Sequence, residues 1–583
     1  MSGRVTFRRA LVAQEREITN TNTTPTTPTT TMRRAAILSA TVLVALLASP
    51  LARADPDASM TPVVPTTAGN VQGEVIDGIY TFKGIPYAAD TSGANRWAAP
   101  KDPESWSDVR NATTFMDWCP QPTPSLGGTD GAVIGTETIS NAMGVPSQYT
   151  DKYQMSEDCL GLNVYAPALD EKLPVMVWIH GGALYTGAGS IYDGEALVNA
   201  GPVIVVTINY RLGFLGYIAH PELNETNFGL LDQVKALEWV RDNIESFGGD
   251  PSKVTIFGES AGGTSVVALM ASPLSEGLFK RVIAESASFP ESPNVTVSEG
   301  GKLGVAVGEQ LGVPAGAGQL EKMREASFEE LVLADVRMDT PEYNYNMPVL
   351  LYVDNTSLPL CLFCAFQEGS IHQVDLMIGT NNNETAMFNF VANITNPNTT
   401  DAYEQETEKQ YGENAKEILS LFPGSPDSDA FATSELVGTA GQFGAPAFFA
   451  ANKSSELGNP TFLYNFAGTA HTPVLDPLEG FHSLDVDYIF DNNGTTALWR
   501  DMQKYWTTFA RTGNPNAESL PEWKAFEGAD PSWMVLSDDK IGSEPVPEDM
   551  QAVYAVMNEF YPNWVMATNG GNNYFTTPST SNE

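Results

Sequence analysis

Apolar runs alternate with amphipathic stretches in the first half of the chain. Three short runs, 174–179, 203–208 and 254–257, are almost uninterrupted by polar residues. Their length and their β-branched residues are typical of strands that are buried on both faces. Between the second and third runs, apolar residues from Leu230 to Ile244 recur at helical spacing. This alternation predicts βαβ units and therefore a parallel sheet with helices on both faces.

The run at 254–257 leads directly into the turn Gly258–Glu259–Ser260–Ala261–Gly262, and a helical pattern follows through 264–271. A sharp turn from strand to helix exposes a serine hydroxyl, and the glycines around it let strand and helix approach closely. Ser260 is therefore a candidate nucleophile. A glycine-rich turn without any chemistry shows the same pattern, so the neighbouring segments must decide.

A second turn with small side chains follows the run at 174–179, at His180–Gly181–Gly182–Ala183. Its backbone amides are suited to bind a negatively charged oxygen. The amide of Ala261 would lie at the N-terminus of the helix after the serine, where the helix dipole also favours negative charge. We expect Gly182, Ala183 and Ala261 to form an oxyanion hole.

Longer motifs resemble those of type-B carboxylesterases, the cholinesterase-like branch of the α/β-hydrolases. They are FKGIPYA at 82–88, SEDCLGLNVY at 156–165, the serine turn, and FARTGNPN at 509–516. The resemblance covers almost the whole chain after residue 60. It implies an α/β-hydrolase fold, with a large, mostly parallel central sheet and helices on both faces, in a single domain over residues 60–565.

The resemblance extends to two segments that would complete a catalytic triad with Ser260. The segment 379–384 ends in Glu384, the candidate acid, and the segment 480–490 carries His482, the candidate base. The order Ser260, Glu384, His482 along the chain is the order found in α/β-hydrolases. His471, in the same loop region, is the competing candidate for the base. A histidine base predicts activity that falls at acid pH with a pKa of about 6–7.

Other charged residues and histidines are assigned to structure. The resemblance implies internal ion pairs between Arg96 and Glu157 and between Arg211 and Asp232, which specify the fold rather than take part in catalysis. For the remaining histidines we expect packing or surface positions; they are His180, His220 and His372.

The first 54 residues predict an export signal preceded by a leader. Residues 32–54 have the charged start, apolar middle and small-residue cleavage site of a secretory signal peptide. The Thr-rich residues 1–31 precede this signal, which normally begins a chain, so Met32 is the expected true start. The alternative is an uncleaved membrane anchor, because about 17 apolar residues nearly span a bilayer. The polar tail 566–583 is expected to be disordered.

The composition argues against nucleic acid as a partner. The chain has 31 basic and 71 acidic side chains, a formal net charge of −40, and such a surface repels a phosphate backbone. We expect the acidity to serve solubility in an extracellular, salty or acidic medium.

Sequons for N-glycosylation are candidate glycan sites if the source is eukaryotic, although an Asn/Thr-rich bacterial chain would contain them too. They include Asn111, Asn224, Asn294, Asn355, Asn393, Asn398, Asn452 and Asn493.

The four cysteines of an exported chain indicate two disulfides rather than a metal site, because no further ligands stand at metal-binding spacing. The resemblance implies a bridge between Cys119 and Cys159. Cys361 and Cys364 depart from the family pattern. They form either a short local disulfide, which we favour, or a CxxC sequence without redox function.

The sequence thus predicts a secreted serine esterase that hydrolyses small-molecule carboxylic esters through an acyl-enzyme, without metal, cofactor or lasting membrane span. Choline esters are disfavoured, because Tyr149 stands where the resemblance to cholinesterases would require a tryptophan. A lipase is disfavoured, because the segment between Cys119 and Cys159 lacks the apolar stripe of a lid helix. A non-catalytic adhesion protein of the same fold remains the third alternative, against which the intact triad argues.

Overall fold

The computed structural model describes residues 61–123, 153–289, 297–336, 351–391, 394–472, 475–490 and 496–567. The expected leader, the signal peptide, Tyr149 and residues 568–583 lie outside these ranges.

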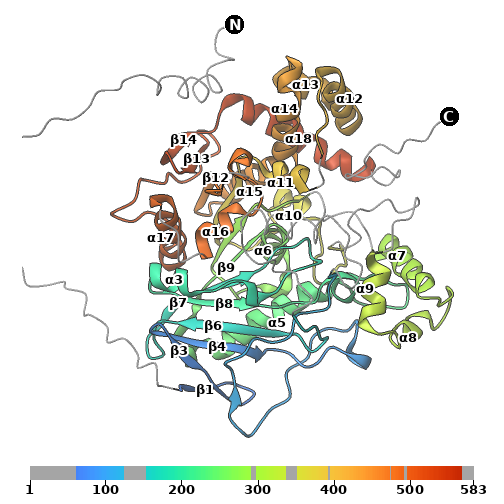
Figure 1. Ribbon diagram of the computed structural model, residues 1–583, viewed down its shortest axis with the longest axis vertical. Helices are drawn as coiled ribbons and strands as arrows, with labels where there is room; N and C mark the ends of the chain where they lie inside the picture. Colours follow the sequence, from blue (N-terminus) through green and yellow to red (C-terminus); the bar gives the residue numbers. More distant parts are fainter. Residues whose placement is uncertain are drawn as a thin grey trace, which may run out of the picture. The chain divides into compact units, whose positions relative to one another are not determined.

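A large mixed sheet forms the centre of the described part of the chain (Figure 1). Seven neighbouring strands, from β8 through β7 and β9 to β13, run parallel. Antiparallel strands flank them at both edges. In spatial order the sheet contains β14 (Ile541–Pro545), β13 (Ser532–Ser537), β12 (Thr461–Ala467), β11 (Asp375–Asn381), β10 (Arg281–Glu285), β9 (Gly249–Glu259), β7 (Leu173–Ile179), β8 (Ile204–Ile208), β6 (Gly161–Ala166), β4 (Ile79–Pro86) and β3 (Glu74–Ile76). A separate small sheet contains β1 (Val63–Pro65), β2 (Asn70–Gln72) and β5 (Arg110–Asn111).

Helices cover both faces of the large sheet, which confirms the predicted fold class. One face packs against α5 (Phe228–Asn243), α6 (Ala261–Ala271), α10 (Leu362–Glu368), α15 (Ala445–Glu456) and α18 (Glu548–Ala567). The other packs against α3 (Glu195–Ala200), α16 (Leu484–Phe490) and α17 (Ala497–Thr512). A third cluster joins α4 (Gly213–Tyr217), α7 (Val297–Gln310), α8 (Gln319–Met323) and α9 (Phe328–Val336). The remaining helices are α11 (Glu384–Val391), α12 (Thr400–Tyr411), α13 (Ala415–Leu421) and α14 (Asp427–Thr439).

The apolar runs seen in the sequence form the middle of this sheet. In β7, Val175 and Val177 face one core cluster, while Met176 and Trp178 face the other. Successive side chains of a strand point to opposite faces, so a strand between two helical layers needs apolar residues at every position. This explains why uninterrupted apolar runs, rather than alternating ones, predicted β7 and β8. In the described part of the chain, no helix is both long and apolar enough to cross a membrane.

Both expected disulfides are formed, between Cys119 and Cys159 and between Cys361 and Cys364. In the described ranges, no cluster of three or more ligand side chains could hold a metal ion.

Both expected ion pairs are also present and buried. The guanidinium of Arg96 binds both carboxylate oxygens of Glu157. Arg211 contacts Asp232 through Nε at 2.8 Å and through Nη2 at 2.7 Å. These pairs are structural, as the sequence predicted.

The Arg211–Asp232 pair gives a stability prediction. Asp232→Asn should lower the free energy of unfolding by about 3–5 kcal/mol, because it leaves a buried guanidinium without its counter-charge. The measurement is urea unfolding followed by fluorescence. Asp242→Asn is the matched control, since Asp242 pairs with Arg241 at a site where both side chains are about half exposed, and it should change stability by less than about 1 kcal/mol. Equal losses in the two variants would contradict a special role for the buried pair.

Candidate active site

Ser260 lies at the tip of a tight turn between β9 and α6. Its backbone has φ 56° and ψ −121°, a conformation that L-residues rarely adopt, and its amide donates to the carbonyl of Glu285 at 2.9 Å. A Cβ at Gly262 would lie only 2.0 Å from the carbonyl oxygen of Ile179. Glycine therefore lets α6 approach β7, and the serine is left half-buried rather than covered.

His482 reaches this serine from the loop that follows β12. Its Nε2 lies 2.8 Å from Ser260 Oγ. The rings of Phe388 and Phe443 pack against the imidazole, and their centroids lie 5.0 and 4.9 Å from the centroid of the His482 ring. Phe443 belongs to a π-helical turn, Ala440–Gly444, of the kind that often occurs at functional sites. These rings restrict the imidazole and keep water from its faces.

Glu384, the first residue of α11, holds the other nitrogen of the imidazole. Its Oε2 lies 2.6 Å from Nδ1 of His482. Its Oε1 accepts hydrogen bonds from the Asn381 amide at 2.7 Å and from Ser286 Oγ at 2.6 Å. A carboxylate held in this way keeps the proton of a neutral His482 on Nδ1, so Nε2 is free to accept the proton of Ser260.

A second carboxylate, that of Glu259, also approaches the imidazole. Its Oε1 lies 3.2 Å from Nε2 of His482 and accepts a hydrogen bond from Ser483 Oγ at 2.6 Å. Burial lowers the pKa of His482, but the charges of Glu259 and Glu384 raise it more, and its pKa becomes about 9. Burial raises the pKa of Glu259 to about 7. The pKa of the imidazole therefore lies above the expected range of about 6–7, because the expectation omitted Glu259.

Two further carboxyl groups are buried behind the triad. Asp485 accepts hydrogen bonds from Asn381 Nδ2 at 3.0 Å and from the Tyr464 hydroxyl at 3.2 Å. Glu285 accepts one from Trp506 Nε1 at 2.8 Å. Burial raises the pKa of Asp485 to about 6 and that of Glu285 well above its usual range. The raised pKa favours the neutral form of Glu285, and this lowers the desolvation cost of the buried cluster.

The turn after β7 lies beside the serine. A Cβ at Gly181 would lie 3.2 Å from Cβ of Ser260. Within the described part of the chain, the amides of Gly182 and Ala183 donate to no acceptor, and the amide of Ala261 is the first of α6, which by position has no intrahelical partner. Gly182 and Ala183 thus follow directly on a residue that packs against Ser260, Ala261 is the next residue after the serine, and all three are half-buried.

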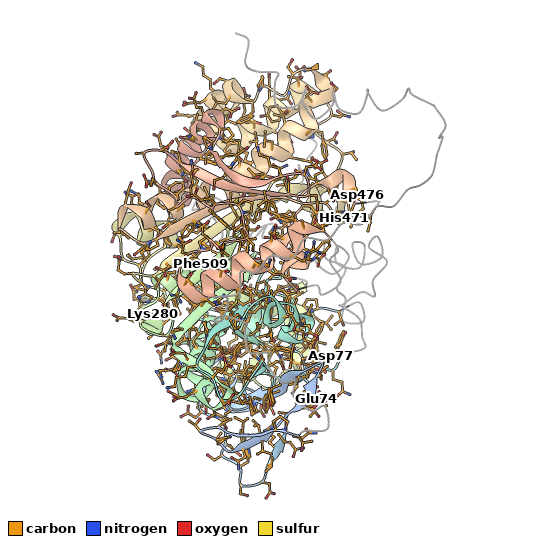
Figure 2. All side chains as sticks on the ribbon, turned by 90° about the vertical axis from the view of Figure 1, so that its left-hand side faces the viewer. Glu74, Asp77, Lys280, His471, Asp476 and Phe509 are labelled. Carbon is orange, nitrogen blue, oxygen red and sulfur yellow. A yellow bond between two sulfur atoms is a disulfide. The ribbon has the colours of Figure 1, made fainter. Side chains whose placement is uncertain are left out.

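The competing histidine, His471, lies elsewhere. Its side chain is 40% exposed and lies 3.5 Å from Asp538, and its Nε2 lies 3.2 Å from the Tyr488 hydroxyl. Figure 2 labels it next to Asp476, on the right-hand side of the drawn side chains. Of the two candidates for the base, His482 is the one that contacts the serine.

The remaining histidines have structural surroundings. His180 is fully buried, stacks on Tyr210 with ring centroids 4.4 Å apart, and donates from Nδ1 to the Gly181 carbonyl at 2.8 Å. Burial lowers its pKa to about 4, so it is neutral. His220 contacts Gln319, and His372 contacts the Ser272 carbonyl.

Sequence reasoning missed several residues that shape the site. They are Glu259, Ser286, Asn381, Phe388, Phe443 and Ser483. Glu259 had a usable signal, since an acidic residue directly before the nucleophile must lie near the base. For Ser286 and the phenylalanines, the chain carries no comparable local pattern.

Comparisons with known proteins agree with this geometry. The sequence profile of the Carboxylesterase family matches residues 60–553. The para-nitrobenzyl esterase of Bacillus subtilis (strain 168) is 36% identical over 525 residues, which cover 85% of this chain and 99% of the relative. The human cocaine esterase is 34% identical, over 82% of this chain and 88% of the relative. A solved structure of a PNB esterase superimposes with a TM-score of 0.70 at 33% identity, over 85% of this chain and 99% of that one. The chain therefore belongs to the carboxylesterase family of α/β-hydrolases, and it is a carboxylic ester hydrolase.

Proposed function

We propose that the protein hydrolyses esters through a covalent acyl-enzyme formed on Ser260. His482 takes the proton of Ser260 Oγ as the oxygen attacks the ester carbonyl, and it returns that proton to the leaving alcohol. Glu384 orients the imidazole and balances its positive charge. Water then attacks the acyl-enzyme by the same route and releases the acid. The observation that carries this proposal is the unbroken series of contacts from Ser260 through His482 to Glu384.

The oxyanion of each tetrahedral intermediate is assigned to the amides of Gly182, Ala183 and Ala261. Backbone donors suit this role, because they are fixed before the negative charge develops. Removal of one such donor costs about 2.7–4 kcal/mol of transition-state stabilisation in comparable sites.

For the substrate, we propose soluble or moderately hydrophobic carboxylic esters. Relatives of this chain are named as esterases of para-nitrobenzyl esters and cocaine and as a medium-chain fatty acyl-CoA hydrolase. The rings of Phe388 and Phe443 give the site apolar walls beside the base. A non-catalytic adhesion protein would not need an intact, hydrogen-bonded triad. The triad therefore favours an enzyme over an adhesion protein.

We also propose that the protein is exported. Two disulfides are typical of an oxidising compartment. The sequon residues Asn111, Asn224, Asn355 and Asn398 are exposed, and glycans on them would meet no steric obstacle if the source attaches them.

The nucleophile is tested by substitution and by labelling. Ser260→Ala should lower kcat for p-nitrophenyl acetate by about 10⁴–10⁶-fold, because no other group in the triad can form the acyl-enzyme. A sulfonyl fluoride should label Ser260 in the unmodified protein, as seen by peptide mapping. Full activity of the variant, or a label on a different residue, would refute the assignment.

The base is tested by a pair of histidine variants. His482→Ala should lower kcat by several orders of magnitude, whereas His471→Ala, the matched control, should stay within about tenfold of the unmodified protein. Steady-state kinetics with the same ester measure both. A larger loss from the His471 variant would move the base to the exposed position.

The pH dependence is tested at Glu259. A raised pKa means that His482 keeps its proton to higher pH, so kcat/KM should rise with pH through a midpoint above about 6.5. Glu259→Gln removes one charge that raises this pKa, and the midpoint should shift to lower pH by about one unit or more. Glu245→Gln, an equal charge change at a 67% exposed side chain, should leave the profile in place. Identical profiles for all three proteins would contradict the role of Glu259.

A further inference from the structure

Gln121 makes an unusual set of contacts beside the oxyanion residues. It lies two positions after Cys119 and is 1% exposed. Its Oε1 accepts a hydrogen bond from the Gly187 amide at 2.8 Å. Its Nε2 donates to the Gly187 carbonyl at 2.9 Å and to the Cys119 carbonyl at 3.0 Å. One side-chain amide thus binds both backbone groups of a single residue, as a neighbouring strand would.

Gly187 is the far end of the turn that carries the oxyanion amides. It has φ +115°, and a Cβ there would lie 2.3 Å from Nδ1 of His180, the first residue of the turn. The two ends of the turn, 180 and 187, are therefore in direct contact. Any shift of Gly187 must move the turn that it closes.

The turn is strained between these ends. Ala183 and Leu184 are consecutive non-glycine residues with φ of 57° and 60°, and each such residue costs about 1–3 kcal/mol. The Gly182 carbonyl accepts from the amides of Tyr185 and Thr186, both at 2.9 Å. A conformation of this kind persists only where the surroundings hold it in place.

We propose that Gln121 is a positioning residue, which holds the oxyanion amides of Gly182 and Ala183 in their productive places through its paired bonds to Gly187. The inference rests on the proposed function, because the position of these amides matters only if they bind the oxyanion. The Cys119–Cys159 bridge fixes the segment from which Gln121 projects.

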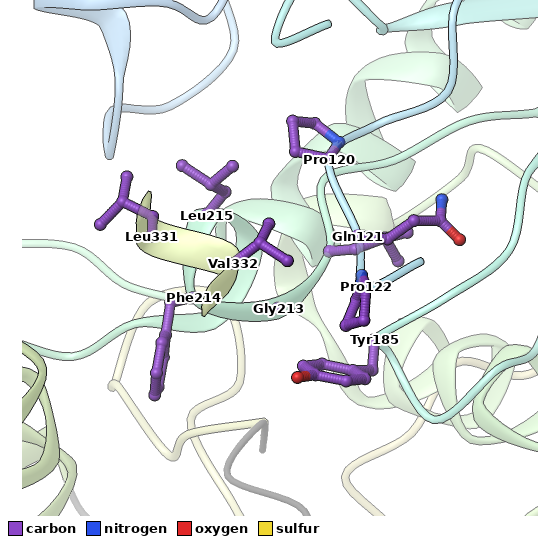
Figure 3. Close-up of a pocket in the computed structure, with 10 residues that line it drawn as sticks. Pro120, Gln121, Pro122, Tyr185, Gly213, Phe214, Leu215, Leu331 and Val332 are labelled. Atoms are coloured by element: carbon purple, nitrogen blue, oxygen red, sulfur yellow. The ribbon is translucent and has the colours of Figure 1, made fainter. Parts of the chain in front are cut away.

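Gln121 acts from behind the turn rather than by contact with substrate. Figure 3 shows its amide directed away from the small apolar pocket that its backbone borders. Pro120 and Pro122, on either side of it, have fixed φ angles and stiffen the segment.

The test compares Gln121→Met, which keeps the size of the side chain and loses its polar groups, with the matched control Gln319→Met. Gln319 is also a buried glutamine that donates to two backbone carbonyls, those of Val305 and Val313. Its contacts, which include His220 Nε2 at 3.1 Å, lie on and beside α7 and α8, and none of them is a residue of the proposed catalytic site. The readouts are kcat and KM for p-nitrophenyl acetate, the thermal unfolding midpoint, and the inhibition constant of a trifluoromethyl ketone, which forms an oxyanion on the serine.

For Gln121→Met we expect kcat to fall by about ten- to a hundredfold, since a misplaced oxyanion donor costs about that much. KM should stay within about twofold, and the ketone should bind more weakly by the same factor as kcat falls. Gln319→Met should lower the unfolding midpoint comparably and leave kcat and ketone binding unchanged. Unchanged ketone binding in Gln121→Met, or equal losses in both variants, would overturn the proposal.

A second variant is available in case Gln121→Met does not accumulate as folded protein. Gln121→Glu keeps the acceptor for the Gly187 amide and loses the donor to the Gly187 carbonyl. For this variant too, kcat should fall while KM stays nearly unchanged.

Failure of the proposed function can be told apart from failure of this inference. It would appear as ester hydrolysis by Ser260→Ala, or as an unmodified protein that the ketone does not inhibit.

Discussion

The backbone contact between β7 and the start of α6 is the constraint on which the site depends. A Cβ at Gly262 would lie 2.0 Å from the Ile179 carbonyl oxygen, and one at Gly258 would lie 2.5 Å from the same atom. Only glycine permits this approach, and it places Ser260 next to the turn that follows Ile179. Glu384 and His482 follow β11 and β12 and reach the same place, because parallel strands end at the same edge of a sheet. The packing of strands and helices thus sets the positions of the three side chains.

Charge is the second constraint, because one imidazole lies among several buried carboxyl groups. Glu259 and Glu384 contact His482, and Asp485 and Glu285 lie behind them. A buried cluster cannot keep every carboxylate ionised without large desolvation costs, so protons are retained. Burial raises the pKa of Glu285, while the charges of Glu259 and Glu384 outweigh burial and raise the pKa of His482. In the proposed mechanism His482 must be neutral to take the Ser260 proton, and the same carboxylates then balance the positive charge that forms on the imidazole.

Much of this arrangement was predictable from sequence, and the exceptions have a common cause. Uninterrupted apolar runs predicted β7 and β8, and helical spacing predicted α5, to within two residues at each end. The three residues of the predicted triad, which are in contact in the structure, could be named because each stands in a contiguous motif. Gln121 and Ser286 were not, since their partners lie 66 and 98 residues away in sequence. Periodicity reports burial, but a hydrogen bond between distant loops depends on backbone geometry that no local pattern encodes.

Backbone strain marks the residues whose backbone angles in the fold differ from those that L-residues prefer. In the described part of the chain, eleven non-glycine residues have positive φ. One is Ser260 itself, and four others lie in the segments that pack around it: Ala183, Leu184, Ser286 and Ser483. Strain of this kind costs about 1–3 kcal/mol per residue, and it survives only where stronger contacts impose it. At Ser260 the imposing contact is glycine packing against β7, and at Ala183 it is the closure of the turn by Gly187. The proposed oxyanion donors and nucleophile are therefore fixed before substrate arrives, which is the condition under which backbone amides stabilise a developing charge most effectively.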